Sequence, residues 1–180
     1  MVARARRATS QPLSLKARAI GLLAQREHSA VELRRKLMRI ARAQVQAQLQ
    51  AQALAQDGVE EEQAADPAAE VTALLIWLQA QGYLDETRFV ESRLHVRAAR
   101  HGNLRIEQEL AQHGLALGAE QKAALRDSEL DRARTIWLRK FGSPGADAAA
   151  RAKQMRFLAG RGFSPEVIRR LLREGSQGEG

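Results

Sequence analysis

The sequence has no cysteine, only four prolines among 180 residues, and few aromatic residues: two tryptophans, one tyrosine and four phenylalanines. The absence of cysteine excludes disulfide frameworks, thiolate zinc sites and thiol catalysis, and it favours a cytoplasmic location. The longest strongly apolar run, 73–78, is far shorter than the roughly 18 residues that a transmembrane helix needs. No membrane span is therefore expected.

Catalytic and metal-binding motifs are also missing. The sequence contains no phosphate-binding loop of the G-x-x-x-x-G-K-[ST] type, no H-E-x-x-H and no G-x-S-x-G. Glu107 and Glu109 are two residues apart, so on a helix they point to different faces. The four histidines lack metal-ligand spacing and are expected to cap or pack: His28, His95, His101 and His113. We predict no enzyme activity, no cofactor and no metal site.

Charge is unevenly distributed along the chain. Lysine and arginine number 29 against 21 acidic residues, which gives a net charge of +8 and a pI near 10.9. Residues 1–42 carry eleven basic and two acidic residues, 43–86 carry eight acidic residues and no basic one, and 87–180 carry eighteen basic and eleven acidic residues. A basic chain of this kind favours nucleic acid or another polyanionic surface as its partner.

The acidic block includes an insert, residues 41–67, within an otherwise basic protein. Its first part, 41–56, is rich in alanine and glutamine and has high helix propensity, whereas its second part, 57–67, is polar and acidic. We expect a helical extension that frays into a linker.

Helix signals fill almost all the rest of the chain, and no alternating run of β-branched residues predicts a strand. The predicted fold is all-α. Nine helices are expected, over residues 14–26, 30–42 or beyond, 68–81, 86–100, 104–112, 118–126, 129–140, 146–160 and 165–173.

Helix start and stop signals recur along the chain. The predicted N-caps are Ser29 with Glu32, Ser128 with Asp131, and Ser164 before Pro165. Three segments, 78–83, 110–115 and 158–163, share leucine, three residues, glycine and an apolar residue, the pattern of a Schellman C-cap. Residues 28–37 also align with 101–110 at a constant shift of 73, and 152–163 matches the end of the second copy. These repeats predict short helical units that stack on one another.

Basic clusters are the strongest functional signal. On three predicted helices, arginine and lysine recur at i, i+3 or i+4, so they can form stripes that neutralise phosphates. One such stripe is more often a solvated face, but three on a net positive chain favour binding. The predicted partner- or DNA-contact residues are Arg34, Arg35 and Lys36 on the second helix, Arg97 and Arg100 on the fourth, Arg105 on the fifth, and Arg151, Lys153, Arg156 and Arg161 on or just after the eighth.

Four segments taken together are similar to one known family. REHSAVELRRKL (26–37), GYLDETRF (82–89), GNLRIEQEL (102–110) and RFLAGRGFSPEVIRRLL (156–172) resemble, in this order, the motifs of the bacterial regulatory protein RecX family. The similarity covers nearly all of residues 13–173. It implies an elongated array of three tandem three-helix repeats, over 13–84 with the insert 41–67, 85–127 and 128–173, between a basic tail 1–12 and a flexible tail 174–180.

The sequence departs from the family pattern at two places. Asn103 stands where the family often has proline, and we expect it to cap the helix that follows. The insert 41–67 lengthens a connection that is commonly short in the family, and the sequence leaves its role open.

The resemblance also implies a function. Proteins of this family bind the RecA recombinase within the groove of its filament on DNA, and they modulate, mainly inhibit, its strand-exchange, ATPase and coprotease activities in DNA repair. The implied partners are therefore the RecA filament and single- or double-stranded DNA, contacted through the basic faces. No sustained heptad indicates a coiled-coil dimer, so a monomer is expected. The alternative is a stand-alone DNA-binding protein of helix-turn-helix type, using residues 15–42.

Overall fold

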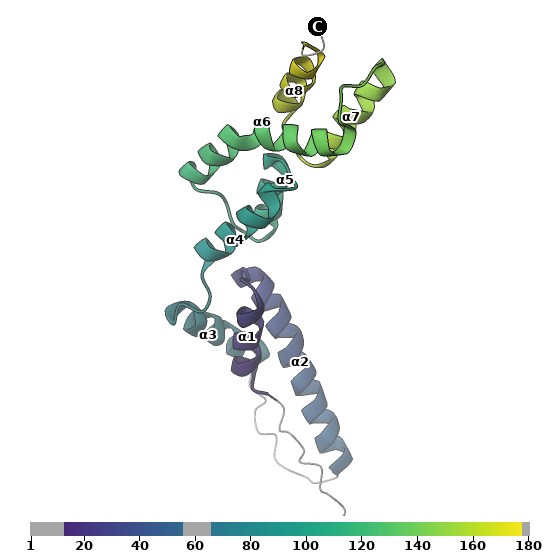
Figure 1. Cartoon of the computed structure of the whole chain (residues 1–180). Helices are drawn as coiled ribbons and strands as arrows, with labels where there is room; N and C mark the ends of the chain where they lie inside the picture. The colour runs from purple at the N-terminus through teal and green to yellow at the C-terminus, as the bar shows by residue number, and fades with distance from the viewer. Residues whose placement is uncertain (1–12, 56–65, 178–180) are drawn as a thin grey trace, which may run out of the picture. The chain divides into compact units, whose positions relative to one another are not determined.

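A computed structural model describes residues 13–55 and 66–177, and these ranges contain helices but no strand. The predicted all-α fold is confirmed. The helices are α1 (Leu15–Gln25), α2 (Ala30–Ala55), α3 (Pro67–Ala80), α4 (Glu86–Ala98), α5 (Asn103–Gln112), α6 (Ala119–Phe141), α7 (Ala148–Gly160) and α8 (Pro165–Gln177) (Figure 1). The predicted basic tail 1–12 and most of the predicted linker lie outside the described residues. Among the described helices, none is both long and apolar enough to cross a bilayer.

Two predicted helices, 118–126 and 129–140, are a single helix, α6, which Figure 1 shows without a break. The predicted N-cap at Ser128 is wrong. Its hydroxyl donates to the carbonyl oxygens of Ala124 (2.8 Å) and Leu125 (3.3 Å) one turn back, so it lies inside a continuing helix. The two halves of α6 therefore stand where the last helix of the second predicted repeat and the first helix of the third were expected.

The other predicted caps are confirmed. The hydroxyl of Ser29 accepts a hydrogen bond from the N–H of Glu32 at 3.1 Å, and that of Ser164 accepts from the N–H of Val167 at 3.4 Å. The three Schellman glycines, Gly82, Gly114 and Gly162, have φ of 71°, 73° and 79°. In each motif the N–H after the glycine donates to the predicted leucine carbonyl, at 2.9, 3.1 and 3.2 Å in chain order. Each glycine therefore ends its helix in the left-handed conformation.

Two helices run further than predicted. The alanine- and glutamine-rich extension continues α2 to Ala55. At the other end of the chain α8 continues to Gln177, so the predicted flexible tail from residue 174 begins with helix instead. Glu174 accepts hydrogen bonds from Arg170 (2.8 Å) and Arg134 of α6 (2.6 Å), which hold the last turns of α8 to its neighbour.

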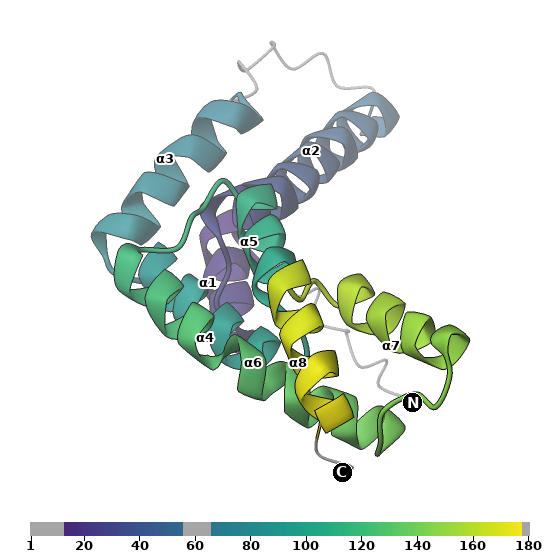
Figure 2. The same ribbon diagram turned by 90° about the horizontal axis from the view of Figure 1, so that it is seen from above.

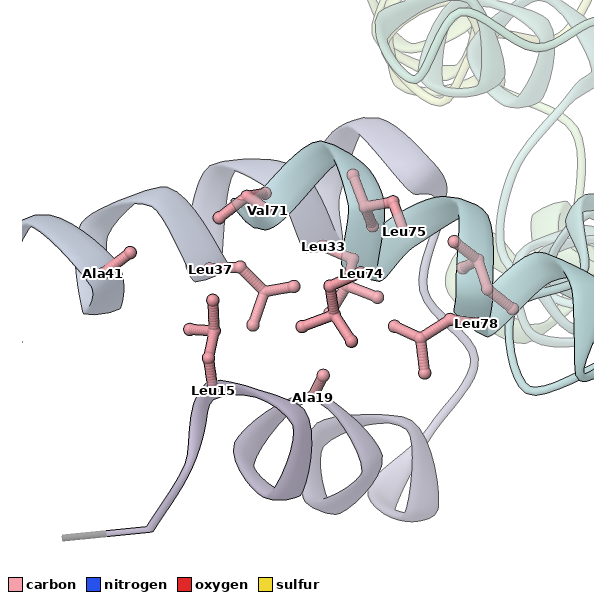
Figure 3. Close-up of a cluster of buried hydrophobic side chains, with 10 residues drawn as sticks. Leu15, Ala19, Leu33, Leu37, Ala41, Val71, Leu74, Leu75 and Leu78 are labelled. Carbon is pink, nitrogen blue, oxygen red and sulfur yellow. The ribbon is translucent and has the colours of Figure 1, made fainter. Parts of the chain in front are cut away.

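The chain divides into two compact units, Met1–Asp85 and Glu86–Gly180. In the first unit α1, α2 and α3 surround one apolar core, shown in Figure 3. Leu15 and Ala19 of α1 face Leu33 and Leu37 of α2 across it, and α3 closes it with four side chains. These four are Val71, Leu74, Leu75 and Leu78.

The second unit has two apolar clusters, and both include side chains of α6. Figures 1 and 2 show α6 as one continuous helix. Its N-terminal half contributes Leu125 to a cluster with Phe89 and Val90 of α4 and Ile106 and Leu110 of α5. Its C-terminal half contributes Ala133, Ile136 and Trp137 to a cluster with side chains from α7, from the loop after it and from α8, namely Leu158, Phe163, Ile168 and Leu171. Because the helix is continuous, the positions of the two clusters within this unit are coupled.

A polar network closes the turn between α1 and α2. His28 is 1% exposed, its Nδ1 donates to the Arg26 carbonyl oxygen (2.9 Å), and its Nε2 accepts from Lys36 (2.9 Å). Burial lowers the pKa of His28, so the ring packs in its neutral form, as predicted for a structural histidine. Glu32 pairs with Arg26 and lies 3.3 Å from the Lys36 ammonium. Burial raises the pKa of Glu32, but the hydrogen bond and charge of Arg26 outweigh it and lower that pKa to about 2.

The low pKa of Glu32 predicts a pH-dependent contribution to stability. Because this pKa lies below the ordinary 4.5, the ionised carboxylate stabilises the fold above pH 4.5, and the contribution disappears as the pH falls towards 2. Glu32→Gln should lower the free energy of unfolding by about 1 kcal/mol at pH 7 and by much less near pH 2, after allowance for the partial exposure of Arg26. Urea unfolding at a series of pH values measures this. The exposed Glu70, changed to Gln, is the matched control, and a pH-independent loss for Glu32→Gln would contradict the assignment.

Candidate functional site

Two glycines bring the loop before α5 and the loop before α8 into backbone contact within the second unit. The N–H of Gly102 donates to the carbonyl oxygen of Arg161 at 3.0 Å, and the N–H of Leu104 donates to that of Gly162 at 3.1 Å. A Cβ on Gly102 would overlap the Gly162 carbonyl, and a Cβ on Gly162 would overlap Arg105. Glycine is therefore required on both sides of this contact, which we call the loop junction.

A buried carboxylate of α6 fastens the loop junction. Glu129 is 3% exposed; its Oε1 accepts from the backbone N–H groups of Asn103 (3.0 Å) and Ser164 (3.2 Å), and its Oε2 accepts from the Ser164 hydroxyl (3.1 Å). The carboxylate thus lies at the N-termini of both α5 and α8, where the helix dipoles favour negative charge. The predicted capping role of Asn103 is wrong, because Gly102 is the N-cap and Asn103 is the first residue of α5.

Glu129 contacts helix N-termini, and Arg132, one turn further along α6, contacts a helix C-terminus. Its guanidinium donates to the carbonyl oxygens of Ala98 (3.3 Å) and His101 (2.7 Å), at and after the C-terminus of α4, and to the side-chain oxygen of Asn103 (2.6 Å). A cation at a helix C-terminus is favoured by the dipole in the same way. Glu129 and Arg132 therefore tie the ends of α4, α5 and α8 to α6.

Three of the predicted contact residues converge beside the loop junction. Arg97 of α4, Arg105 of α5 and Arg161 after α7 all act electrostatically on His101, whose pKa is lowered by burial first and then by these three charges. The Arg161 guanidinium donates to the Arg100 carbonyl oxygen (3.1 Å), which places the backbone of a fourth predicted residue beside the group. We call Arg97, Arg100, Arg105 and Arg161 the basic junction. Its members come from the second and third predicted repeats.

The side chains of the basic junction are held to different degrees. Arg161 stacks on Phe157, with its guanidinium carbon 4.6 Å from the ring centroid, and Arg97 pairs with Glu109 at 2.8 Å. Arg100 and Arg105 are exposed. The junction therefore combines two positioned guanidiniums with two that extend into solvent, and such a cluster attracts anions.

The predicted residues of α2 belong to the first unit, whereas the residues of the basic junction belong to the second. The Arg34 guanidinium donates to the Thr72 hydroxyl of α3 at 2.8 Å, and Lys36 is half-buried against His28. Arg35, the third of them, is exposed. The hydrogen bond of Arg34 therefore joins α2 to α3 within the first unit.

The remaining predicted residues lie on α7. Arg151, Lys153 and Arg156 are all exposed. They belong to the second unit, and within the described part of the chain no hydrogen bond or ion pair joins them to the basic junction. They stay predicted contact residues on a separate helical surface.

Sequence reasoning missed the residues that organise this site. Glu129 interrupts the apolar face of α6, since it lies at the i+4 position after Leu125 and before Ala133, both buried. A carboxylate at such a position is a signal for a buried polar contact, although its partners come from distant parts of the chain. In the described residues no cluster of three histidine or acidic side chains could hold a metal ion.

These observations define a class: an all-α protein built of short helical units that pack on one another. The family model for the third three-helix domain of RecX matches residues 127–172. The regulatory protein RecX of Ralstonia nicotianae is 47% identical over 165 residues, covering 90% of this chain and 88% of the relative, and that of Herminiimonas arsenicoxydans is 43% identical over 169 residues, covering 93% and 96%. The chain belongs to the RecX family of regulatory proteins.

Solved structures show the same fold. The crystal structure of RecX from Lactobacillus salivarius superposes with a TM-score of 0.60 at 13% identity, covering 91% of this chain and 95% of that one. A second crystal structure of a regulatory protein RecX gives 0.55 at 18% identity, covering 92% and 82%. At such low identity the likeness is one of fold.

Proposed function

We propose that this RecX-type regulator acts in the cytoplasm on the RecA recombinase, by binding the RecA–DNA filament and lowering its ATPase, strand-exchange and coprotease activities. The family and the fold support the regulatory role. The basic junction supports the way of binding, because a group of arginines from two predicted repeats attracts polyanions.

The arrangement of the basic junction suggests how binding could depend on the repeats. Arg97 and Arg105 belong to α4 and α5, whereas Arg161 follows α7, and the loop junction holds these elements together. A polyanion that contacts all of them bridges two repeats at once. Glu109 already holds Arg97 and Phe157 already holds Arg161, so only the exposed Arg100 and Arg105 need to be ordered on binding.

The decisive measurement is RecA-dependent ATP hydrolysis on single-stranded DNA, titrated with this protein, with duplex binding measured at the same salt concentration. We expect inhibition at concentrations well below those that coat naked duplex. Unchanged hydrolysis at saturation would overturn the proposal. Tight, sequence-dependent binding to duplex together with unchanged hydrolysis would instead support the stand-alone DNA-binding alternative.

Charge reversal tests whether the basic junction carries the binding. The double variant Arg100→Glu/Arg105→Glu should raise the concentration for half-inhibition about tenfold or more, since it removes two cations and adds two anions at one surface. Both side chains are exposed, so the fold should be kept, and circular dichroism checks this. The control is Arg139→Glu/Lys140→Glu, an equal charge change at exposed positions of α6. Equal effects of the two pairs would show that net charge, and not the junction, matters.

A further inference from the structure

A small polar pocket lies between α4 and α5, next to the basic junction. Its volume is about 330 Å³, and the charged groups that line it are Arg93, Arg97, Arg105 and Glu109. Gln108, Gln112 and His113 complete the lining. Three guanidiniums thus face one carboxylate in a space large enough for a phosphate group. With three cationic groups and one anionic group in its lining, the pocket carries a net positive charge.

Glu109 is the only acid in the lining, and it is shared. Its carboxylate lies 2.8 Å from Nε of Arg97 and 3.3 Å from NH1 of Arg93, and its side chain is 19% exposed. One arginine would be enough for an ion pair that only joined α4 to α5, whereas Glu109 lies close to two arginines of α4. Here the carboxylate occupies the position between two guanidiniums that an incoming oxyanion would take, so it acts as an internal anion at the pocket.

The shape of the lining favours a phosphodiester strand over a single carboxylate. Arg105, Gln108 and Gln112 follow one another at i, i+3 and i+7 on one face of α5, a distance of about 10 Å along the helix axis. Guanidinium and amide groups in a row are donors suited to successive phosphate and sugar oxygens. The pocket also shares Arg97 and Arg105 with the basic junction, so a strand could continue from one to the other.

We propose that this pocket is a phosphate subsite for a nucleic-acid strand, and that Glu109 attenuates it, because the phosphate must displace the Glu109 carboxylate from Arg97. This proposal deepens the proposed function and rests on it in one respect: the nucleic-acid strand is the DNA of the RecA–DNA filament. The side chain of Glu109 therefore has two effects of opposite sign: it stabilises the α4–α5 pair in the free protein, and it weakens binding of the strand.

Neutralising Glu109 gives a result that a purely structural role would not. Glu109→Gln should bind a fluorescein-labelled single-stranded oligonucleotide about threefold more tightly, and the slope of log affinity against log salt should steepen by up to about one ion. Its melting temperature should fall slightly, because the pair with Arg93 and Arg97 is lost. Glu107→Gln, the same change at an exposed position of the same helix, should change affinity by less than about 1.5-fold.

The opposite substitution completes the test. Arg97→Gln should weaken oligonucleotide binding and reduce the salt slope by about one, whereas Arg169→Gln, an exposed arginine of α8, should leave both nearly unchanged. Weaker or unaltered binding by folded Glu109→Gln would overturn the inference. These titrations contain no recombinase, so they test the pocket independently of the proposed effect on RecA. Inhibition of RecA without the Glu109 effect would retain the proposed function alone, and the Glu109 effect without inhibition would retain the pocket alone.

Discussion

Replacing Glu129 with alanine is expected to lower the free energy of unfolding of the second unit by about 3 kcal/mol. The carboxylate is buried, and three donors from the starts of α5 and α8 bond to it. Its removal leaves those donors without a partner in a region closed to water, and it leaves the charge of Arg132 without its neighbour. The loss should therefore exceed that of an ordinary exposed glutamate many times over.

Urea unfolding measures this loss when the signal comes from the second unit. In a Trp77→Phe background the fluorescence reports on Trp137, which is 4% exposed in the C-terminal cluster of that unit. Glu129→Gln should lose less than Glu129→Ala, because the amide oxygen still accepts. Asp127→Ala, at an exposed position of the same helix, should stay within about 0.5 kcal/mol of the parent protein. Equal losses at 127 and 129 would refute the fastening role of Glu129.

The second large effect is expected at Gly162. Gly162→Ala should destabilise the second unit by about 3 kcal/mol, the sum of a left-handed backbone cost and a steric clash. The new Cβ would lie 2.5 Å from the backbone nitrogen of Arg105, and the backbone at Gly162 has φ of 79°. The clash separates the two loops, so the backbone bonds of the loop junction and the approach of Arg161 to Arg105 are lost together.

Gly82→Ala is the matched control for this glycine. Gly82 ends α3 of the first unit in the same Schellman motif with φ of 71°, but nothing lies within 4 Å of a Cβ added there. Its substitution should cost about 1 kcal/mol, the conformational part alone. Gly162→Ala should also reduce inhibition of RecA more than its stability predicts, because it disrupts the basic junction. Equal losses of unfolding free energy in the two alanine variants would show that the close approach of the loops adds nothing to the cost of the substitution.

The positions of most helices were predictable because their signals are local. The Schellman glycines and the caps at Ser29 and Ser164 each depend on residues within one turn of each other, and the structure confirms them. The prediction failed at Ser128, where the same local pattern occurs inside α6. The half of α6 after this serine buries Ala133, Ile136 and Trp137, and the half before it buries Leu125, so a break would separate two packed faces of one helix. Tertiary packing overrides the capping signal there.

The sequence by itself determined the helical class, the repeated units, the basic character and the arginines that could bind a polyanion. Only the tertiary structure decided which of these arginines act together. Arg97 and Arg161 are 64 positions apart in the chain, and both act on His101 because Gly102 and Gly162 allow two loops to touch and Glu129 bonds to both loops. Helix formation depends on neighbours within one or two turns, whereas the charge density of a binding surface depends on distances that only packing sets.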